Sequence, residues 1–231
     1  MATPTVTATA VTTGGSTASA NPSVLLPATV NVGDLLIGLI RKDNEATMTW
    51  PAGWTKIVGD ASDTADDQTS CAWKIADGTE GGTSITITTG VSGKYAALSY
   101  AIGGADSIEV SSLAIGSSTT PDPPAITPAA GSQDYLILWM GGWQGEQTSP
   151  PAAAPTNYTN LIGSNSGTAG ATATNCRVAS ARRAVTGTTE NPGTLTISVS
   201  DAWTAFTIAV WKQPPPTQLP FFTKSQNWRW L

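Results

Sequence analysis

Short segments that are apolar, or that alternate between apolar and polar residues, recur along the chain with turn-forming residues between them. Residues 5–12 alternate Thr with Val and Ala, which is the pattern of a strand with one buried face. Residues 35–40 form a nearly continuous apolar run bounded by turn signals, which indicates a central strand. The 3.6-residue period of an amphipathic helix is absent. The pattern therefore predicts an all-β protein.

Two sets of strands follow from this reading. The first set comprises residues 5–12, 24–30 with an interruption at Pro27, 35–40, 54–58, 70–75, 84–88 and 95–102. The second set comprises residues 135–140, 158–162, 176–184, 194–199 and 205–211. Many short strands between Gly, Pro, Asn and Asp turns are typical of a β-sandwich or a jelly roll. We expect a β-sandwich of jelly-roll-like character.

The second set echoes the first, which predicts an internal pseudo-repeat. Residues 33–40 match residues 133–140 at an offset of 100, so Asp34 and Asp134 are expected at equivalent strand starts. Further matches pair 51–57 with 155–161 and 79–87 with 189–197. We assign residues 1–212 to the sandwich, with pseudo-repeats at about 20–110 and 121–212. Two small sandwiches in tandem and one larger sandwich with interleaved strands both remain open, and we prefer the single sandwich.

Charge and composition exclude several partners. The net charge is −5 and only 12% of the residues are charged, which argues against binding nucleic acid through phosphate contacts. The adjacent basic pairs Arg41-Lys42 and Arg182-Arg183 are interpreted as solvated strand ends. No apolar run approaches the roughly 20 residues of a membrane span. The first residues lack the pattern of a signal peptide, so we expect synthesis in the cytoplasm without export by a cleaved signal.

Catalytic chemistry has little support in the sequence. The chain has no His, which removes His-dependent nucleophilic sites and His-ligated zinc. A carboxylate pair would have to come from Glu109, Asp134, Glu146 or Asp201, and no spacing brings two of these together. We predict that the protein is not an enzyme, has no catalytic residues and uses no cofactor.

Metal binding and disulfide formation are the weaker alternatives at two further features. Residues 60–67 hold four Asp, which could contribute to a calcium site, but their spacing fits no defined calcium loop. We interpret them as a solvated hairpin tip and predict no metal site. Cys71 and Cys176 fall at non-equivalent repeat positions, which favours buried, unpaired thiols over a disulfide.

The nine Trp residues divide into predicted core positions and loop-edge positions. Trp50 precedes Pro51, and Trp143 lies within a Gly-rich segment. Aromatic faces can stack on sugar rings, so Trp50 and Trp143 are the candidate glycan-binding residues. The other strand-borne Trp residues are expected in the core.

The last 19 residues differ in composition from the rest. Residues 213–216 (QPPP) predict an extended, Pro-rich linker. Four aromatic residues then fall within residues 221–230. Their apolar surface has to be covered, either by a binding partner or by the sandwich of the same chain. We favour docking on a partner through Phe221, Phe222, Trp228, Arg229, Trp230 and Leu231.

The strand and turn pattern resembles that of a family of Thr/Gly-rich β-sandwich proteins from the structural modules of tailed bacteriophages. The resemblance covers about residues 20–212 and is carried by residues 32–36 (VGDLL), 51–55 (PAGWT), 76–80 (ADGTE) and 99–104 (SYAIGG). It implies a virion structural protein, in several copies per particle, with other capsid, neck or tail proteins as partners. A capsid decoration protein or head fibre is the preferred role. The alternative is a carbohydrate-binding module or host-receptor adhesin that recognises a surface glycan.

Overall fold

The computed structural model describes residues 2–12, 17–44, 47–62, 67–145, 151–167 and 175–213. Within these ranges every regular element is a β-strand, and the strands form antiparallel sheets packed on one another. This confirms the prediction of an all-β sandwich.

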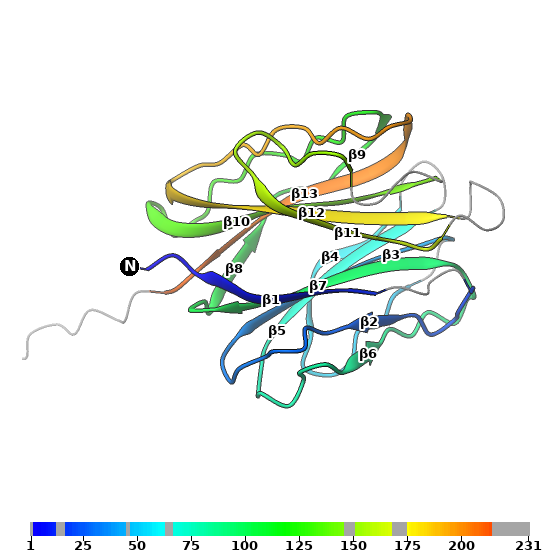
Figure 1. Cartoon of the computed structure of the whole chain (residues 1–231), viewed down its shortest axis with the longest axis horizontal. Helices are drawn as coiled ribbons and strands as arrows, with labels where there is room; N and C mark the ends of the chain where they lie inside the picture. Colours follow the sequence, from blue (N-terminus) through cyan, green and yellow to red (C-terminus); the bar gives the residue numbers. More distant parts are fainter. Residues whose placement is uncertain are drawn as a thin grey trace, which may run out of the picture.

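Two large sheets make up the body (Figure 1). The first sheet has the order β1-β7-β3-β5-β4, with β1 (Thr5–Thr12), β3 (Leu35–Lys42), β4 (Thr55–Ser62), β5 (Gln68–Ile75) and β7 (Tyr95–Gly103). The second sheet has the order β11-β12-β10-β13-β8, with β8 (Ser107–Val110), β9 (Ala114–Ser118), β10 (Gln133–Gln144), β11 (Thr159–Asn165), β12 (Cys176–Gly187) and β13 (Asp201–Trp211). Strand β9 also pairs with β13.

Residues 5–103 supply the first sheet and residues 107–211 supply the second, and the two sheets have the same order. Strands β3, β5, β4 and β7 correspond to β10, β12, β11 and β13, while β1 corresponds to the divided edge of β8 and β9. The expected interleaving of strands from both halves is therefore wrong. Tandem sandwiches do not describe the arrangement either, because the two sheets pack face to face and share one core.

The shared core consists of alternate residues on the facing strands. Leu35, Ile37 and Leu39 of β3 lie in one apolar cluster with Leu136 and Leu138 of β10. Val178, Phe206 and Ile208 extend the cluster across β12 and β13. At about 25 cal/mol per Å² of buried apolar surface, this layer is the main source of stability between the halves.

Each sheet is also covered on its outer face, so the molecule has four layers. Strands β2 (Ser23–Leu25) and β6 (Ser84–Thr86) pair with each other and lie beneath the first sheet, on the side away from β10 and β12 (Figure 1). Over the second sheet, extended segments outside the named strands cover the outer face. There Leu195 N donates to Pro121 O at 3.0 Å, and Ile197 N donates to Thr119 O at 2.9 Å.

Most predicted strands are present, with three differences. Residues 28–30 and 194–199 form no strand, although Leu195 and Ile197 are buried in the outer layer of the second sheet. Strands β8 and β9 were not predicted, because β8 (SIEV) has only four residues and β9 (AIGSS) has only five, most of them small or polar.

The pseudo-repeat is real in topology, but its offset in the central strand differs from the expected 100. The inner face carries Leu35 in β3 and Leu136 in β10, whereas Tyr135 faces the outer layer. A shift of one residue moves every side chain of a strand to the opposite face. Asp34 and Asp134 are therefore not equivalent, which corrects the sequence alignment of the two halves.

The turn before β4 is repeated faithfully before β11. Trp54 N donates to Pro51 O at 3.2 Å, and Tyr158 N donates to Pro155 O at 2.9 Å. The residue before each aromatic has a positive φ, +87° at Gly53 and +67° at Asn157. Gly and Asn are the residues that adopt this conformation most readily.

Candidate functional site

A group of charged and hydroxyl side chains lies buried between the two sheets, where β3 and β10 end. Arg41 Nε donates to Asp67 Oδ2 at 3.2 Å, and both side chains are fully buried. Arg41 also donates to Thr69 Oγ1 at 3.2 Å, and Thr69 and Thr204 share a hydrogen bond of 2.8 Å across the two sheets. Gly142 leaves room for the Arg41 side chain, since a Cβ there would meet Arg41 Cδ at 2.8 Å. The group thus joins the sheets through polar contacts.

The sequence interpretation of Arg41 and Lys42 as a solvated strand end is wrong, because both residues are buried. Arg41 continues the inward series of Leu35, Ile37 and Leu39 at a spacing of two, but the sequence does not show this series because β3 is buried on both faces. Burial lowers the pKa of Lys42, whose ammonium donates to Asn44 Oδ1 at 2.6 Å. Both positive charges thus bind polar groups of the fold itself, Arg41 at Asp67 and Lys42 at Asn44.

A second polar link between the sheets lies close by. Lys94, just before β7, donates from Nζ to Asn175 Oδ1 at 2.9 Å, and Asn175 directly precedes β12. Cys176 lies between this link and the ion pair, with its Sγ 3.8 Å from Asp67 Oδ2 and 3.7 Å from Lys94 O. Arg41, Lys94 and Cys176 therefore belong to one inter-sheet polar cluster with Asp67 and Asn175.

Among the described residues, this cluster contains no accessible nucleophile. Cys71 and Cys176 are buried and unpaired, as the sequence predicted. Burial raises the pKa of the Cys176 thiol, and the negative charge of Asp67 raises it further. Burial likewise raises the pKa of the Cys71 thiol. A thiol that stays protonated is a poor nucleophile, so these side chains act as core residues.

The two candidate glycan-binding tryptophans are buried. Trp143 has no exposed surface and packs in the outer core of the second sheet. Trp50 is 8% exposed, donates from Nε1 to Ser70 Oγ at 2.9 Å, and covers Gly38 of β3. Neither ring has a face open to a sugar, so the prediction of a glycan platform at these residues is wrong. Local sequence placed them at loop edges, but the outer layers cover them.

All twelve aromatic side chains that the structure describes are buried or half-buried. The remaining four aromatics of the chain are Phe221, Phe222, Trp228 and Trp230. Together with Arg229 and Leu231 they make up the predicted docking segment, which lies outside the described residues. None of the aromatic side chains in the described body is therefore fully exposed.

The point at which the chain leaves the second sheet is fixed by Asp106. Lys212 Nζ lies 2.8 Å from Asp106 Oδ2, and Gln213 N donates to Asp106 Oδ1 at 2.8 Å. The Gln213 side chain accepts from Trp211 Nε1 and Ser107 Oγ, both at 3.3 Å. Hydrogen bonds with Lys212 and Gln213 lower the pKa of Asp106 although partial burial opposes them. Gln213 is thus held in a defined place.

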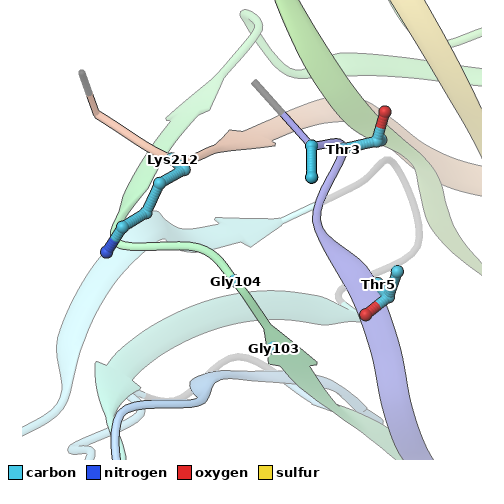
Figure 2. Close-up of a pocket in the computed structure, with 6 residues that line it drawn as sticks. Thr3, Thr5, Gly103, Gly104 and Lys212 are labelled. Atoms are coloured by element: carbon cyan, nitrogen blue, oxygen red, sulfur yellow. The ribbon is translucent and has the colours of Figure 1, made fainter.

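A hollow of about 460 Å³ opens beside this exit (Figure 2). Figure 2 shows Lys212 on one side of it and Thr3 and Thr5 on the other, across the turn at Gly103 and Gly104. Among the described residues that line it, Lys212 is the only charged one, and it is paired with Asp106.

Four of the described carboxylates that were considered for catalysis or calcium each have a separate partner. Glu109 accepts from Ala129 N at 2.9 Å, and Asp134 accepts from Thr186 Oγ1 at 2.6 Å. Asp60 pairs with Lys56 at 3.0 Å, whereas Asp67 is buried beside Arg41. Glu146 and two of the four Asp in residues 60–67 lie outside the described residues. Within the described ranges, no three Cys, Asp or Glu side chains come together as metal ligands.

Comparison of the chain with protein-family models, with curated proteins and with solved structures gave no match. In the part of the chain that the structure describes, no helix is long and apolar enough to cross a membrane. The described residues form a sandwich with a polar cluster between its sheets, and Asp106 fixes the position of Gln213, where the chain leaves the second sheet.

Proposed function

We propose that this protein is a structural component of a bacteriophage particle, displayed on the particle surface as a capsid decoration protein or head fibre. The sandwich is its body, and the aromatic segment after the Pro-rich stretch attaches it to another virion protein. The proposal assigns no reaction to the chain.

The distribution of aromatic residues carries this proposal. The described body buries or half-buries all its aromatics, so Phe221, Phe222, Trp228 and Trp230 are the aromatics left for a partner. Trp and Arg are enriched at the energetic centres of protein interfaces. Burial of one aromatic side chain contributes about 1.5–3 kcal/mol before entropy costs, so a few of them suffice for firm attachment.

The fixed exit supports the same proposal. Asp106 holds Lys212 and Gln213 against the body, so whatever follows residue 213 starts from a defined place. The next residues are three consecutive Pro, which favour an extended chain with little conformational freedom to lose on binding. An anchor attached in this way can reach a partner without unfolding the sandwich.

Mass spectrometry of purified particles from the source of this sequence tests the role directly. We expect the chain among the virion proteins, in several copies, and its absence would overturn the proposal. Attachment is tested with the full chain carrying Trp228→Ala and Trp230→Ala, added to particles that lack the protein. We expect at least a tenfold loss of occupancy.

A matched control changes two polar residues of the same segment, Lys224→Ala with Gln226→Ala. Occupancy of this control should remain close to that of the unchanged chain. Equal losses in both double variants would show that the segment does not dock through its tryptophans. The adhesin alternative is not proposed, because its candidate glycan-binding residues Trp50 and Trp143 are buried.

A further inference from the structure

Among the described residues, the sandwich has two sides whose edge strands pair with no further strand, and the two sides differ in charge. On one side β1 and β11 are the edge strands of the two sheets, and Ser164 of β11 donates to Thr12 O of β1. On the opposite side the edges are β4 in one sheet and β8 with β9 in the other. Unpaired edges offer backbone N–H and C=O groups to any incoming strand.

The side formed by β4, β8 and β9 carries the features that protect edges from pairing. Strand β4 has two register shifts and bears the Lys56–Asp60 ion pair. The second edge on this side is divided into β8 of four residues and β9 of five. Glu109 of β8 is bonded to Ala129 N. Charges, bulges and short strands all oppose edge-to-edge association.

The other side lacks these charges. Neither β1 (TVTATAVT) nor β11 (TNLIGSN) contains a Lys, Arg, Asp or Glu. Thr5, Thr7 and Thr9 are exposed along β1, and β-branched Thr pairs well with Thr on a neighbouring strand. The register of β1 with β7 shifts once, between Val6 and Ala8, and that of β11 with β12 shifts once, between Thr159 and Ile162. Ala8 to Thr12 and Ile162 to Asn165 remain in regular pairing.

We propose that the β1/β11 side is a self-association surface that joins two copies of this chain. A two-fold axis perpendicular to the sheets places β1 antiparallel to β1 of the second copy, and it places the two β11 edges opposite each other. Such an interface uses the same surface on both copies, as two-fold dimers require. Its uncharged edges bring no like charges together, which matters for copies that each carry a net charge of −5.

The size of this side is adequate for a dimer. An eight-residue strand is about 27 Å long, and packed sheets lie about 10 Å apart. With side chains, this side presents on the order of 500 Å² per copy, or about 1,000 Å² in total, which is the lower limit for a specific interface. We infer a dimer at the weaker end of specific association. This inference does not depend on the proposed place in a virion.

Sedimentation equilibrium of the full chain tests the proposal. We expect a concentration-dependent mass that reaches twice the 23.6 kDa of one chain. The variant with Thr7→Lys and Thr9→Lys should remain at the mass of one chain, because a Lys on each copy opposes pairing across the axis. Its circular dichroism and melting temperature should match those of the unchanged protein, since both Thr are exposed.

The matched control is Thr55→Lys on β4, which is also an exposed Thr in an edge strand. It should dimerise like the unchanged protein. A single Cys introduced at Thr5, Thr7 or Thr9 adds a positional test, because the native thiols are buried. We expect a disulfide-linked dimer from at least one of these positions and none from Thr55→Cys. A monomeric unchanged protein, or a dimer insensitive to the β1 Lys variant, would overturn the proposal.

Discussion

Arg41 and Asp67 form an ion pair in the space between the two sheets, with a nitrogen–oxygen distance of 3.2 Å and no exposure of either side chain. Arg41 lies at the end of β3, and Asp67 directly precedes β5, so both belong to the first sheet. Arg41 reaches over Gly142 of the second sheet, and Thr69 bonds to Thr204. A buried pair adds little net stability, but it penalises any packing of the sheets that leaves a charge unpaired.

Removal of one partner should therefore be costly. We expect Arg41→Met and Asp67→Asn each to lower the free energy of unfolding by about 3–5 kcal/mol, because the remaining group stays buried without its partner. Urea unfolding measures this loss. As a control, Lys56→Ala breaks a partly exposed pair and should cost no more than about 1 kcal/mol. If Arg41→Met and Asp67→Asn each lowered the free energy of unfolding by less than about 1 kcal/mol, this expectation would be contradicted.

Trp143 should behave as a core residue. Trp143→Ala removes a fully buried ring and should cost about 3–5 kcal/mol in denaturant unfolding. Trp54 is only half-buried at the outer core of the first sheet, so Trp54→Ala should cost clearly less. If the Trp143 variant kept full stability, the ring would have to be exposed in solution.

The repeated turn provides a test of backbone conformation that is separate from packing. A Cβ at Gly53 would meet no atom within 4 Å, but its φ is +87°. Gly53→Ala should thus destabilise the fold by about 1–2 kcal/mol through backbone strain alone. Gly59 in β4 also has open space and no positive φ, so Gly59→Ala should be neutral or slightly stabilising. Equal thermal shifts in the two variants would contradict this reasoning.

Glu80 should contribute to the fall in the free energy of unfolding at low pH. Burial by itself would raise its pKa, but the hydrogen bonds from Lys74 and from the backbone N–H of Asp77 lower the pKa below the ordinary value of 4.5. A carboxylate with a lowered pKa stabilises the fold above the unfolded pKa, and this stability is lost as the pH falls through the folded pKa. Glu80→Gln should flatten the decline of unfolding free energy between pH about 5 and 3. Lys74→Met should act in the same direction, and an unchanged slope in both variants would refute the assignment.

Tyr100 should affect how the free energy of unfolding changes at high pH. Burial raises the pKa of Tyr100 to about 12, although the hydrogen bond to Ser180 Oγ partly opposes this. The neutral phenol is therefore favoured by folding, and its contribution is full below pH about 10 and lost as the pH rises through the folded pKa. Absorbance titration should show fewer tyrosines ionising near pH 10 in the folded protein than in denaturant. Tyr100→Phe should decline less in stability above pH 10, and identical alkaline profiles would contradict the prediction.

Local sequence determined the parts of this protein that depend on neighbouring residues. Alternation predicted β1 at its observed bounds, and the Pro51 and Pro155 turns were recognised because their geometry is set within four residues. The repeated strand pattern was also visible in the sequence, and it corresponds to two sheets of the same order.

Only the tertiary structure decided which face each central strand turns inward. Strands β3 and β10 are buried on both sides, so their apolar runs carry no two-residue period, and the sequence match aligned Leu35 with Tyr135 instead of Leu136. The outer layers that bury Trp50 and Trp143 are made by segments distant in sequence. The same holds for the partner of Arg41, since Asp67 lies 26 residues away. Burial depends on what packs on a residue, and local pattern cannot specify a covering segment from elsewhere in the chain.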